Sequence, residues 1–330
     1  MGGRCTCLEG EEVFKPKVEL GYPPVHENGG SGSHTAADRG PVSLEGGVVY
    51  TGQWRGQVRE GLGLLERPDG GRYEGQFVAN KAHGSGKLSH INGDTYDGEW
   101  FEDQAQGHGK FVHQDGSSYE GQWHQDMQQG YGVEQWADGS KFEGYYKSSK
   151  KHGKGKLFWA EGSVYEGEFV ENDIHGAGEY RWWDGRIYIG EWDRNHINGT
   201  GRMEWSDGRL YEGNYHEDKK HGHGCFTWSD GRRYDGQWKD GKQHGFGRYM
   251  NANAKVRHGE WKAGKRIRWV DEEHDFEPEP REEAEARVDS PEDDLPCTPS
   301  KRPEDDLQHS FSIESLPLPP QDVGKQRRPV

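Results

Sequence analysis

The stretch YEGEFVENDIHGAGEYRWWDGRI, residues 165–187, decides the fold of this chain. It reappears every 23 residues, with substitutions but without any insertion. A period this strict indicates a repeat array, in which each unit is stabilised by packing on its neighbours. An aromatic residue opens each of the nine copies: Tyr50, Tyr73, Tyr96, Tyr119, Phe142, Tyr165, Tyr188, Tyr211 and Tyr234.

The composition alone points to a different class of chain. Only 29% of the 330 residues are hydrophobic and the formal charge is -16, values that are typical of disordered proteins. The period overrules that interpretation, because the few apolar residues stand at fixed places in every repeat. The acidic balance also makes nucleic acid a poor partner.

Membrane spans and secretion are not indicated. No apolar run reaches the length of a membrane span, and the N-terminus lacks the apolar core of a secretory signal. The spacing of the cysteines suggests no disulfide framework, which favours a reducing, cytoplasmic setting. The four are Cys5, Cys7, Cys225 and Cys297.

Each repeat predicts two short antiparallel strands. Residues 165–169 alternate an aromatic or glycine residue with glutamate, which is the period of a strand with one apolar face. Residues 175–182 predict the second strand by the same alternation. The dipeptide Asp184-Gly185 follows, and it is favoured in two-residue hairpin turns. We therefore expect this turn to pass the chain to the next repeat.

The predicted fold is all-β, an elongated single-layer antiparallel β-sheet ribbon of repeated hairpins. The ribbon is expected over residues 41–270, with a partial cap at 41–49 and an end near Trp261 or Trp269. Residues 1–40 are expected to be a flexible segment, with a Gly/Ser-rich linker at 28–40. Residues 271–330 carry a net charge of about -11 and predict an acidic, Pro-rich disordered tail.

A column of tryptophans stands at one repeat position and has two interpretations. It is either a stripe that binds a ligand or part of the core. We favour the core, because aromatic burial is the only large stabilising contribution that this composition offers. Glycines on the same face would leave room for the rings. The column is Trp136, Trp159, Trp182, Trp205 and Trp228.

The first seven residues, MGGRCTC, match the pattern for myristoylation of Gly2. A single myristoyl chain holds a membrane only marginally, and Cys5 and Cys7 could supply a second signal by palmitoylation. The alternative is a chance match. The tail adds Ser290-Pro291 and Thr298-Pro299, which predict phosphorylation at Ser290 and Thr298. An apolar run at 311–316 is either a partner-binding peptide or without meaning.

Two basic clusters depart from the repeat pattern. Either could contact anionic lipid headgroups or a partner, or could simply be solvated. The first cluster, in the fifth repeat, is Lys147, Lys150, Lys151, Lys154 and Lys156. The second, at the end of the array, is Lys255, Arg257, Lys262, Lys265, Arg266 and Arg268.

The motif Tyr-Glu-Gly-x-Trp/Phe, followed by Gly-x-Gly and Asp-Gly, resembles the MORN (membrane occupation and recognition nexus) repeat. The resemblance covers about residues 44–261. It implies an elongated antiparallel β-ribbon that acts as a scaffold, as in junctophilins, plant phosphatidylinositol phosphate kinases and radial spoke head proteins. The residues outside the array leave no room for a kinase or SET domain. The end of the array and the acidic tail are weakly similar to the radial spoke head layout.

Catalysis is not indicated, because no nucleophile, base and orienting group stand out from the periodic background. Several histidines precede the same glycine of the repeat, so position explains them: His83, His152, His175, His221 and His244. No metal site or cofactor is predicted. We therefore expect a non-enzymatic scaffold that links the cytoplasmic face of a membrane to cytoskeletal or signalling partners.

Three further possibilities stay open. The chain could be a structural subunit of the ciliary axoneme, of the radial spoke head type. It could bind phospholipid through its basic hairpin loops. The two free edge strands of a single-layer ribbon could also pair with a second copy to form a homodimer.

Overall fold

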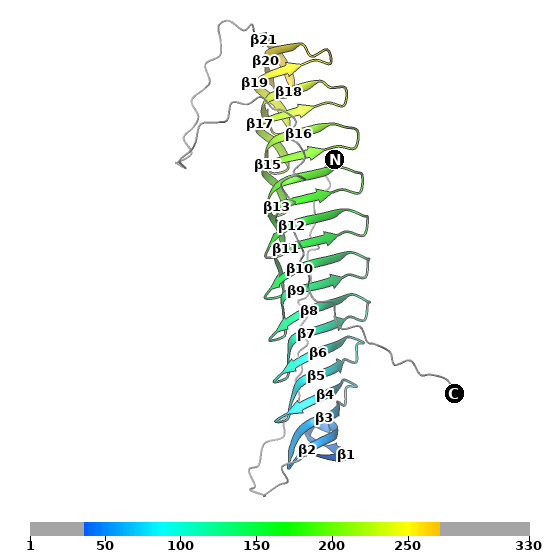
Figure 1. The fold of residues 1–330 in the computed structure, drawn as a ribbon. Coiled ribbons are helices and arrows are strands. Elements are labelled where there is room, and N and C mark those ends of the chain that lie inside the picture. Colours follow the sequence, from blue (N-terminus) through cyan, green and yellow to red (C-terminus); the bar gives the residue numbers. More distant parts are fainter. Residues whose placement is uncertain (1–35, 271–330) are drawn as a thin grey trace, which may run out of the picture. The chain divides into compact units, whose positions relative to one another are not determined.

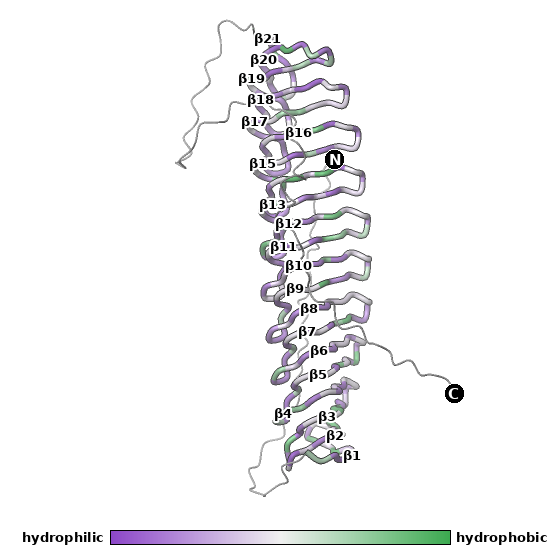
Figure 2. Tube along the Cα trace, in the orientation of Figure 1, coloured by the Kyte–Doolittle hydropathy of each residue, from purple (hydrophilic) through white to green (hydrophobic). Residues whose placement is uncertain are grey.

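The computed structural model describes residues 36–270. They form one antiparallel sheet of 21 strands, and this confirms the predicted fold class. Every strand pairs with the strand before it and the strand after it in the chain, so the hairpins stack in sequence order (Figure 1). Apolar and polar residues are interleaved along the whole ribbon (Figure 2).

The strands of the N-terminal half are β1 (Ala37–Ser43), β2 (Val49–Arg55), β3 (Val58–Glu66), β4 (Arg72–Val78), β5 (Lys81–Ser89), β6 (Thr95–Phe101), β7 (Gln104–Val112), β8 (Ser118–His124), β9 (Met127–Gln135), β10 (Lys141–Lys147) and β11 (Lys150–Phe158). Those of the C-terminal half are β12 (Val164–Val170), β13 (Asp173–Arg181), β14 (Ile187–Asp193), β15 (His196–Glu204), β16 (Leu210–His216), β17 (Lys219–Thr227), β18 (Arg233–Lys239), β19 (Lys242–Met250), β20 (Val256–Lys262) and β21 (Lys265–Val270). A single-turn 3₁₀ helix, Glu45–Gly47, joins β1 to β2.

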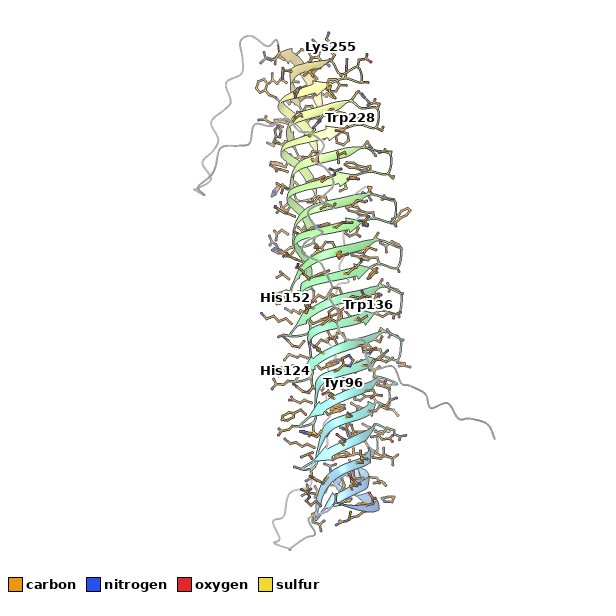
Figure 3. All side chains as sticks on the ribbon, in the orientation of Figure 1. Tyr96, His124, Trp136, His152, Trp228 and Lys255 are labelled. Carbon is orange, nitrogen blue, oxygen red and sulfur yellow. The ribbon has the colours of Figure 1, made fainter. Side chains whose placement is uncertain are left out.

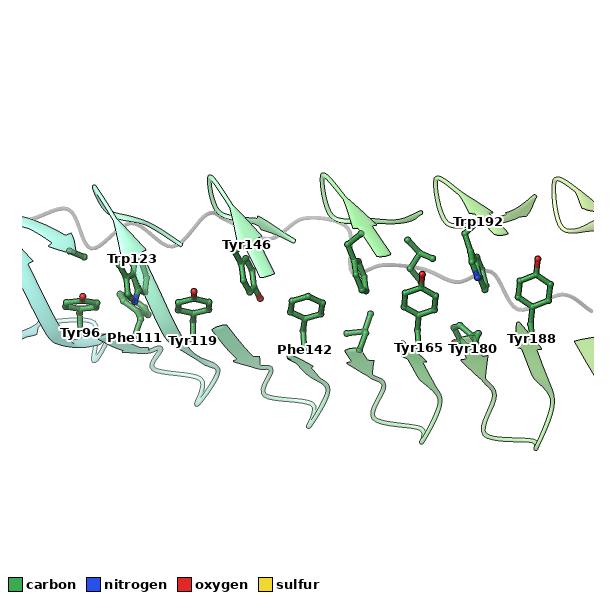
Figure 4. Packing of buried hydrophobic residues seen from close by; sticks show 14 of the residues in the cluster. Tyr96, Phe111, Tyr119, Trp123, Phe142, Tyr146, Tyr165, Tyr180, Tyr188 and Trp192 are labelled. Atoms are coloured by element: carbon green, nitrogen blue, oxygen red, sulfur yellow. The ribbon is translucent and has the colours of Figure 1, made fainter. Parts of the chain in front are cut away.

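Each hairpin is bent at a bulge. In β12 and β13, Gly167 lies opposite Gly178, but the next residue of β12, Glu168, lies opposite His175. Two residues of β13 are therefore unmatched, and Gly176 takes a left-handed φ of 61° there. Bulges bend the strand that contains them. The two arms of each hairpin consequently lie on either side of a row of aromatic rings (Figure 4).

The aromatic residues that open the repeats form the centre of this row and are completely buried. The ring of Tyr165 meets Phe169 of its own repeat edge-on at 5.3 Å and Trp192 of the next repeat at 5.6 Å. Such edge-to-face pairs are favourable beyond the area that they bury. Because each ring contacts two repeats, the core is continuous along the array.

The tryptophan column lies at the border of this core. Its members are partly buried and pack against the fully buried rings. The core role predicted for the column therefore holds in part: the column packs against the core as its partly exposed margin, and the fully buried centre is formed by the opening aromatic residues.

The glycines make room for the rings, as predicted. A Cβ atom on Gly178 would stand 2.3 Å from the hydroxyl oxygen of Tyr165, and one on Gly167 would stand 2.6 Å from the Cα atom of Gly178. Both distances are far below van der Waals contact. The Gly-x-Gly part of the repeat is therefore a packing requirement of the tyrosine.

The turn between repeats is longer than predicted. The amide of Trp182 bonds the carbonyl of Arg186 at 2.9 Å, and Gly185 donates back to the Trp182 carbonyl at 3.0 Å. The loop thus has three residues, 183–185, and Gly185 occupies its left-handed position with a φ of 86°. The two-residue turn expected at Asp184-Gly185 is wrong, because Asp-Gly also suits a type I turn that ends in a left-handed glycine.

The two-residue turn is instead inside each repeat, at the loop between β12 and β13. Glu171 and Asn172 both have positive φ, 53° and 78°, as a type I′ turn requires. The Oδ1 atom of Asn172 accepts a hydrogen bond from the backbone amide of Lys151 at 2.8 Å. The backbone amide of Asn172 donates to the Lys151 carbonyl at 3.0 Å. Each such turn is therefore hydrogen-bonded to the preceding hairpin. Asn80, Asp103, Asp126, Asn195 and Asp218 make the same side-chain bond.

The two ends of the sheet differ from the sequence expectation in detail. Strand β1 begins at Ala37, so the linker predicted to Gly40 is wrong for residues 37–40. At the other end Arg257 replaces the opening tyrosine, and Trp269 of β21 lies opposite Gly259 of β20. The guanidinium groups of Arg257 and Arg266 each stand 4.1 Å from the Trp269 ring. These stacked side chains cover the last ring of the core.

Candidate functional site

The basic cluster of the fifth repeat lies on β10 and β11, but it is not one patch. Lys150 forms an ion pair with Glu171, and Lys156 pairs with Glu166 at 2.9 Å. Lys147 and Lys154 are exposed. Lys151 points into the core, so its prediction as a surface lysine is wrong.

Lys151 belongs to a buried polar network. Its side chain is 10% exposed, and its Nζ atom lies 3.2 Å from Oε2 of Glu134, which is 3% exposed. The same oxygen accepts the hydroxyl of Tyr146 at 2.8 Å. The lysine also faces the rings of Trp136 at 4.7 Å and Phe142 at 5.5 Å. The ammonium is therefore balanced by one carboxylate and two aromatic faces.

The second cluster is divided in the same way. Arg268 pairs with Glu260 at 2.8 Å, and Arg266 stacks on Trp269. Lys262 and Lys265 lie opposite each other across a two-residue turn, and both are exposed. All six residues of this cluster are exposed, and Arg257, Arg266 and Arg268 are engaged with Trp269 or Glu260.

Two other cations occupy the same core-facing position of the repeat as Lys151. Arg59 is completely buried, and its Nη2 atom donates to the Asn80 carbonyl at 2.6 Å. Burial lowers the pKa of Arg59. Lys220 is half-buried among aromatic rings, and burial lowers the pKa of its amine to about 8. Neither residue is among the sequence-predicted site residues.

The outer face of the array carries an exposed aromatic pair. Tyr131 and Tyr145 are 42% and 52% exposed, and their rings meet edge-on with centroids 5.7 Å apart. At the position of Tyr145, other repeats have a polar side chain that accepts a backbone amide from the paired strand. Glu99, for example, accepts the amide of His108 at 3.0 Å. Tyrosine cannot repeat this contact, and exposed tyrosines are enriched where proteins bind proteins.

His124 and His152 lie toward one edge of the array, whereas Trp136 and Trp228 lie toward the other (Figure 3). His90 and His113 occupy the same repeat position as Trp136, in the turns between repeats. Within residues 36–270, no group of three or more histidine, cysteine or acidic side chains could hold a metal ion. No helix in this part of the chain is long and apolar enough to cross a membrane.

Five predicted site residues lie outside the residues that the structure describes. They are the acylation candidates Gly2, Cys5 and Cys7 and the phosphorylation candidates Ser290 and Thr298. They stay predictions.

Comparison with family models finds the MORN repeat nine times in succession, at residues 50–72, 73–95, 96–118, 119–141, 142–164, 165–185, 188–208, 211–232 and 234–253. No curated protein matches the chain. Among solved structures, one similar chain is the TCP domain of SAS-4 from Drosophila melanogaster, in complex with a proline-rich motif of Ana2. It is 12% identical, with 59% of this chain and 99% of that chain covered and a TM-score of 0.31.

Another is the wild-type TCP10 domain of CPAP from Danio rerio. It is 14% identical, with 63% of this chain and 98% of that chain covered and a TM-score of 0.24. Superposition at this level carries no argument about what this chain does.

Proposed function

Because this chain belongs to the MORN-repeat family, with nine consecutive repeats over residues 50–253, we propose that it is a non-enzymatic scaffold. In this role it holds cytoskeletal or signalling proteins at the cytoplasmic face of a membrane. The observation that carries the proposal is the continuous construction of the array. The core rings of every hairpin pack against those of the next one, and its two-residue turn is hydrogen-bonded to the hairpin before it. Partners bound at different repeats would therefore keep a fixed separation.

The exposed pair Tyr131 and Tyr145 supports protein binding on the outer face. Aromatic residues supply large contact area at low entropic cost, and they are common binding hot spots. The test is cross-linking mass spectrometry of the full chain in its own cells. Cross-links to partner proteins should concentrate around β9 and β10 and should fall in the Tyr131→Gln/Tyr145→Gln variant. Unchanged cross-links would contradict this surface.

A matched control substitutes an exposed apolar residue elsewhere. Ile91 is 74% exposed in a turn between repeats, and Ile91→Gln should leave the cross-links in place. Both variants should also keep the melting temperature of the wild type, since none of the three side chains is buried.

Attachment to the membrane rests on the sequence of residues 1–7. Metabolic labelling with a myristate analogue should mark the wild type and not Gly2→Ala, and the variant should leave the membrane fraction. Cys5→Ser/Cys7→Ser should weaken membrane retention while myristate labelling persists. Equal labelling of wild type and Gly2→Ala would refute the tether. Detergent extraction of cilia then tests the axonemal alternative, because an axonemal subunit would stay with the microtubules.

Direct phospholipid binding by the array is less favoured, since Lys150 and Lys156 are paired with acids and Lys151 is buried. The test uses full-length Gly2→Ala protein and anionic phospholipid vesicles at physiological salt. We expect no binding. Binding that disappears in Lys262→Gln/Lys265→Gln would instead favour lipid recognition at the end of the array.

A further inference from the structure

Lys220 stands at the tenth position of the eighth repeat, near the start of β17. At this position the side chain faces the aromatic core, and other repeats place Ile174 and Ile197 there, both buried. The array therefore holds an amine where an aliphatic side chain would serve for packing alone. A cation in such a place needs compensating contacts.

The compensation comes from four aromatic rings. The Nζ atom lies 4.1 Å from the ring centroid of Phe226, 4.8 Å from that of Tyr211, and 5.0 Å from those of both Trp205 and Trp238. These rings come from three consecutive repeats. An arrangement of several aromatic faces around one ammonium is the geometry that recognises methylated ammonium groups.

Lys151 provides an internal comparison at the same repeat position. It faces two rings, and its charge is balanced by Glu134. In the repeat before Lys220, the residue equivalent to Glu134 is Met203, and among residues 36–270 no acidic side chain forms an ion pair with Lys220. The two lysines thus differ in the one feature that an unmodified ammonium needs, which is an acceptor for its N–H groups.

We propose that Lys220 is a site of Nε-methylation, and that the four rings hold the methylated ammonium in place. The rings offer no strong hydrogen-bond acceptor for an N–H group, but they pack well against a methyl group. Each methylation therefore replaces an N–H donor that lacks an acceptor with an apolar group that contacts the rings. The positive charge, and with it the cation–π attraction, is retained. The modification would tighten the contacts among the seventh, eighth and ninth repeats.

The reaction needs a sulfonium methyl donor and the methyltransferase that uses it. The lone pair of the neutral amine attacks the methyl carbon, the new C–N bond forms as the C–S bond breaks, the thioether leaves, and the amine proton passes to solvent. Burial, followed by the charge of Arg209, lowers the pKa of the Lys220 amine to about 8. A larger fraction of this amine is therefore neutral near pH 7.5 than of an ordinary lysine.

The first test is mass spectrometry of the full chain isolated from the cells that make it. Peptides that contain Lys220 should carry one or more methyl groups, whereas Lys151 and the exposed neighbour Lys219 should not. Unmodified Lys220 in native protein, or equal methylation of Lys219, would overturn the proposal.

The second test separates the site from the general chemistry of lysine. Dimethyl-lysine is incorporated genetically at position 220 in one full-length protein and at position 219 in another. Modification at Lys220 should raise the melting temperature by about 2–4 °C, and modification at Lys219 should leave it unchanged. A melting temperature that falls, or does not move, with dimethyl-lysine at 220 would show that the rings do not accept the methylated form.

Discussion

The buried network around Glu134 makes a sharp prediction about stability. Glu134 stands where the other repeats place an apolar or aromatic side chain, and Lys151 stands where Ile174 and Ile197 are found. Changing Glu134→Leu alone leaves the Lys151 ammonium inside the array without its carboxylate. Changing Lys151→Ile alone leaves the Glu134 carboxylate without its cation, although Tyr146 still donates to it at 2.8 Å.

The magnitude follows from burial. Removing one partner of a buried ion pair costs about 3–5 kcal/mol, because the remaining charge is uncompensated. The rings of Trp136 and Phe142 retain part of the attraction to Lys151, so we expect Glu134→Leu to cost about 3 kcal/mol. For an array of this size, that loss lowers the melting temperature by about 6–12 °C. The double change Glu134→Leu/Lys151→Ile removes both charges together but also takes the carboxylate acceptor from the Tyr146 hydroxyl, so it should cost about 1–2 kcal/mol, less than Glu134→Leu alone.

The assay is a double-mutant cycle on the full chain, followed by circular dichroism during thermal and urea unfolding. The coupling between the two sites should be at least about 2 kcal/mol and should favour the pair. Leu65→Ala is a suitable control for simple loss of packing, since Leu65 is buried in a distant repeat and its cost should be the same with and without the Glu134 change. Additive effects of the two single changes would refute the account of Lys151 as a compensated buried charge.

Three further predictions concern the repeat itself. Gly178→Ala should cost at least about 1–3 kcal/mol in unfolding free energy, because its Cβ would stand 2.3 Å from the Tyr165 hydroxyl. Asn172→Ala should cost about 1–2 kcal/mol, since it removes an inter-repeat hydrogen bond and puts alanine at a φ of 78°. Burial raises the pKa of Asp103 to about 6, above its unfolded value, so its contribution to stability is complete below about pH 4 and is lost as the pH rises through 6. In urea unfolding at a series of pH values, Asp103→Asn should keep the bond to the Ala82 amide and flatten this dependence.

Much of the fold could be predicted from the sequence, because two constraints agree at every repeat. Strict alternation fixes which face of residues 165–169 is apolar, and the glycine at 178 has no side chain that would collide with the ring of Tyr165. The turns were harder to assign, since Asp-Gly suits both a two-residue and a three-residue loop. The hydrogen bonds of residues 182–186, rather than the dipeptide, decide between them.

The candidate site was less predictable for a related reason. Nearness in sequence groups the lysines of the fifth repeat together, whereas their roles depend on the face of the strand on which each one lies. Counting back by twos from Leu157, a buried residue, places Lys151 on the core face, and Glu134 could then be paired with it. The exposed pair Tyr131 and Tyr145 also needs the register between neighbouring hairpins, because Tyr131 of β9 lies directly opposite Tyr145 of β10.

The residues that break the repeat pattern solve a problem that the repeats create. Consecutive hairpins are joined by three-residue loops, so connectivity sets the order of the repeats within one chain. Pairing with a second copy is not restricted in this way, and each out-of-register pairing of similar hairpins would still bury an aromatic core. A pairing that placed Glu134 beside an isoleucine instead of Lys151 would bury an unpaired carboxylate, at a cost comparable to half the stability of a small domain. The network of Glu134 and Lys151 therefore penalises such pairings while costing the native array little. The departures on the outer face, Tyr131 and Tyr145 above all, are left to distinguish one partner from another.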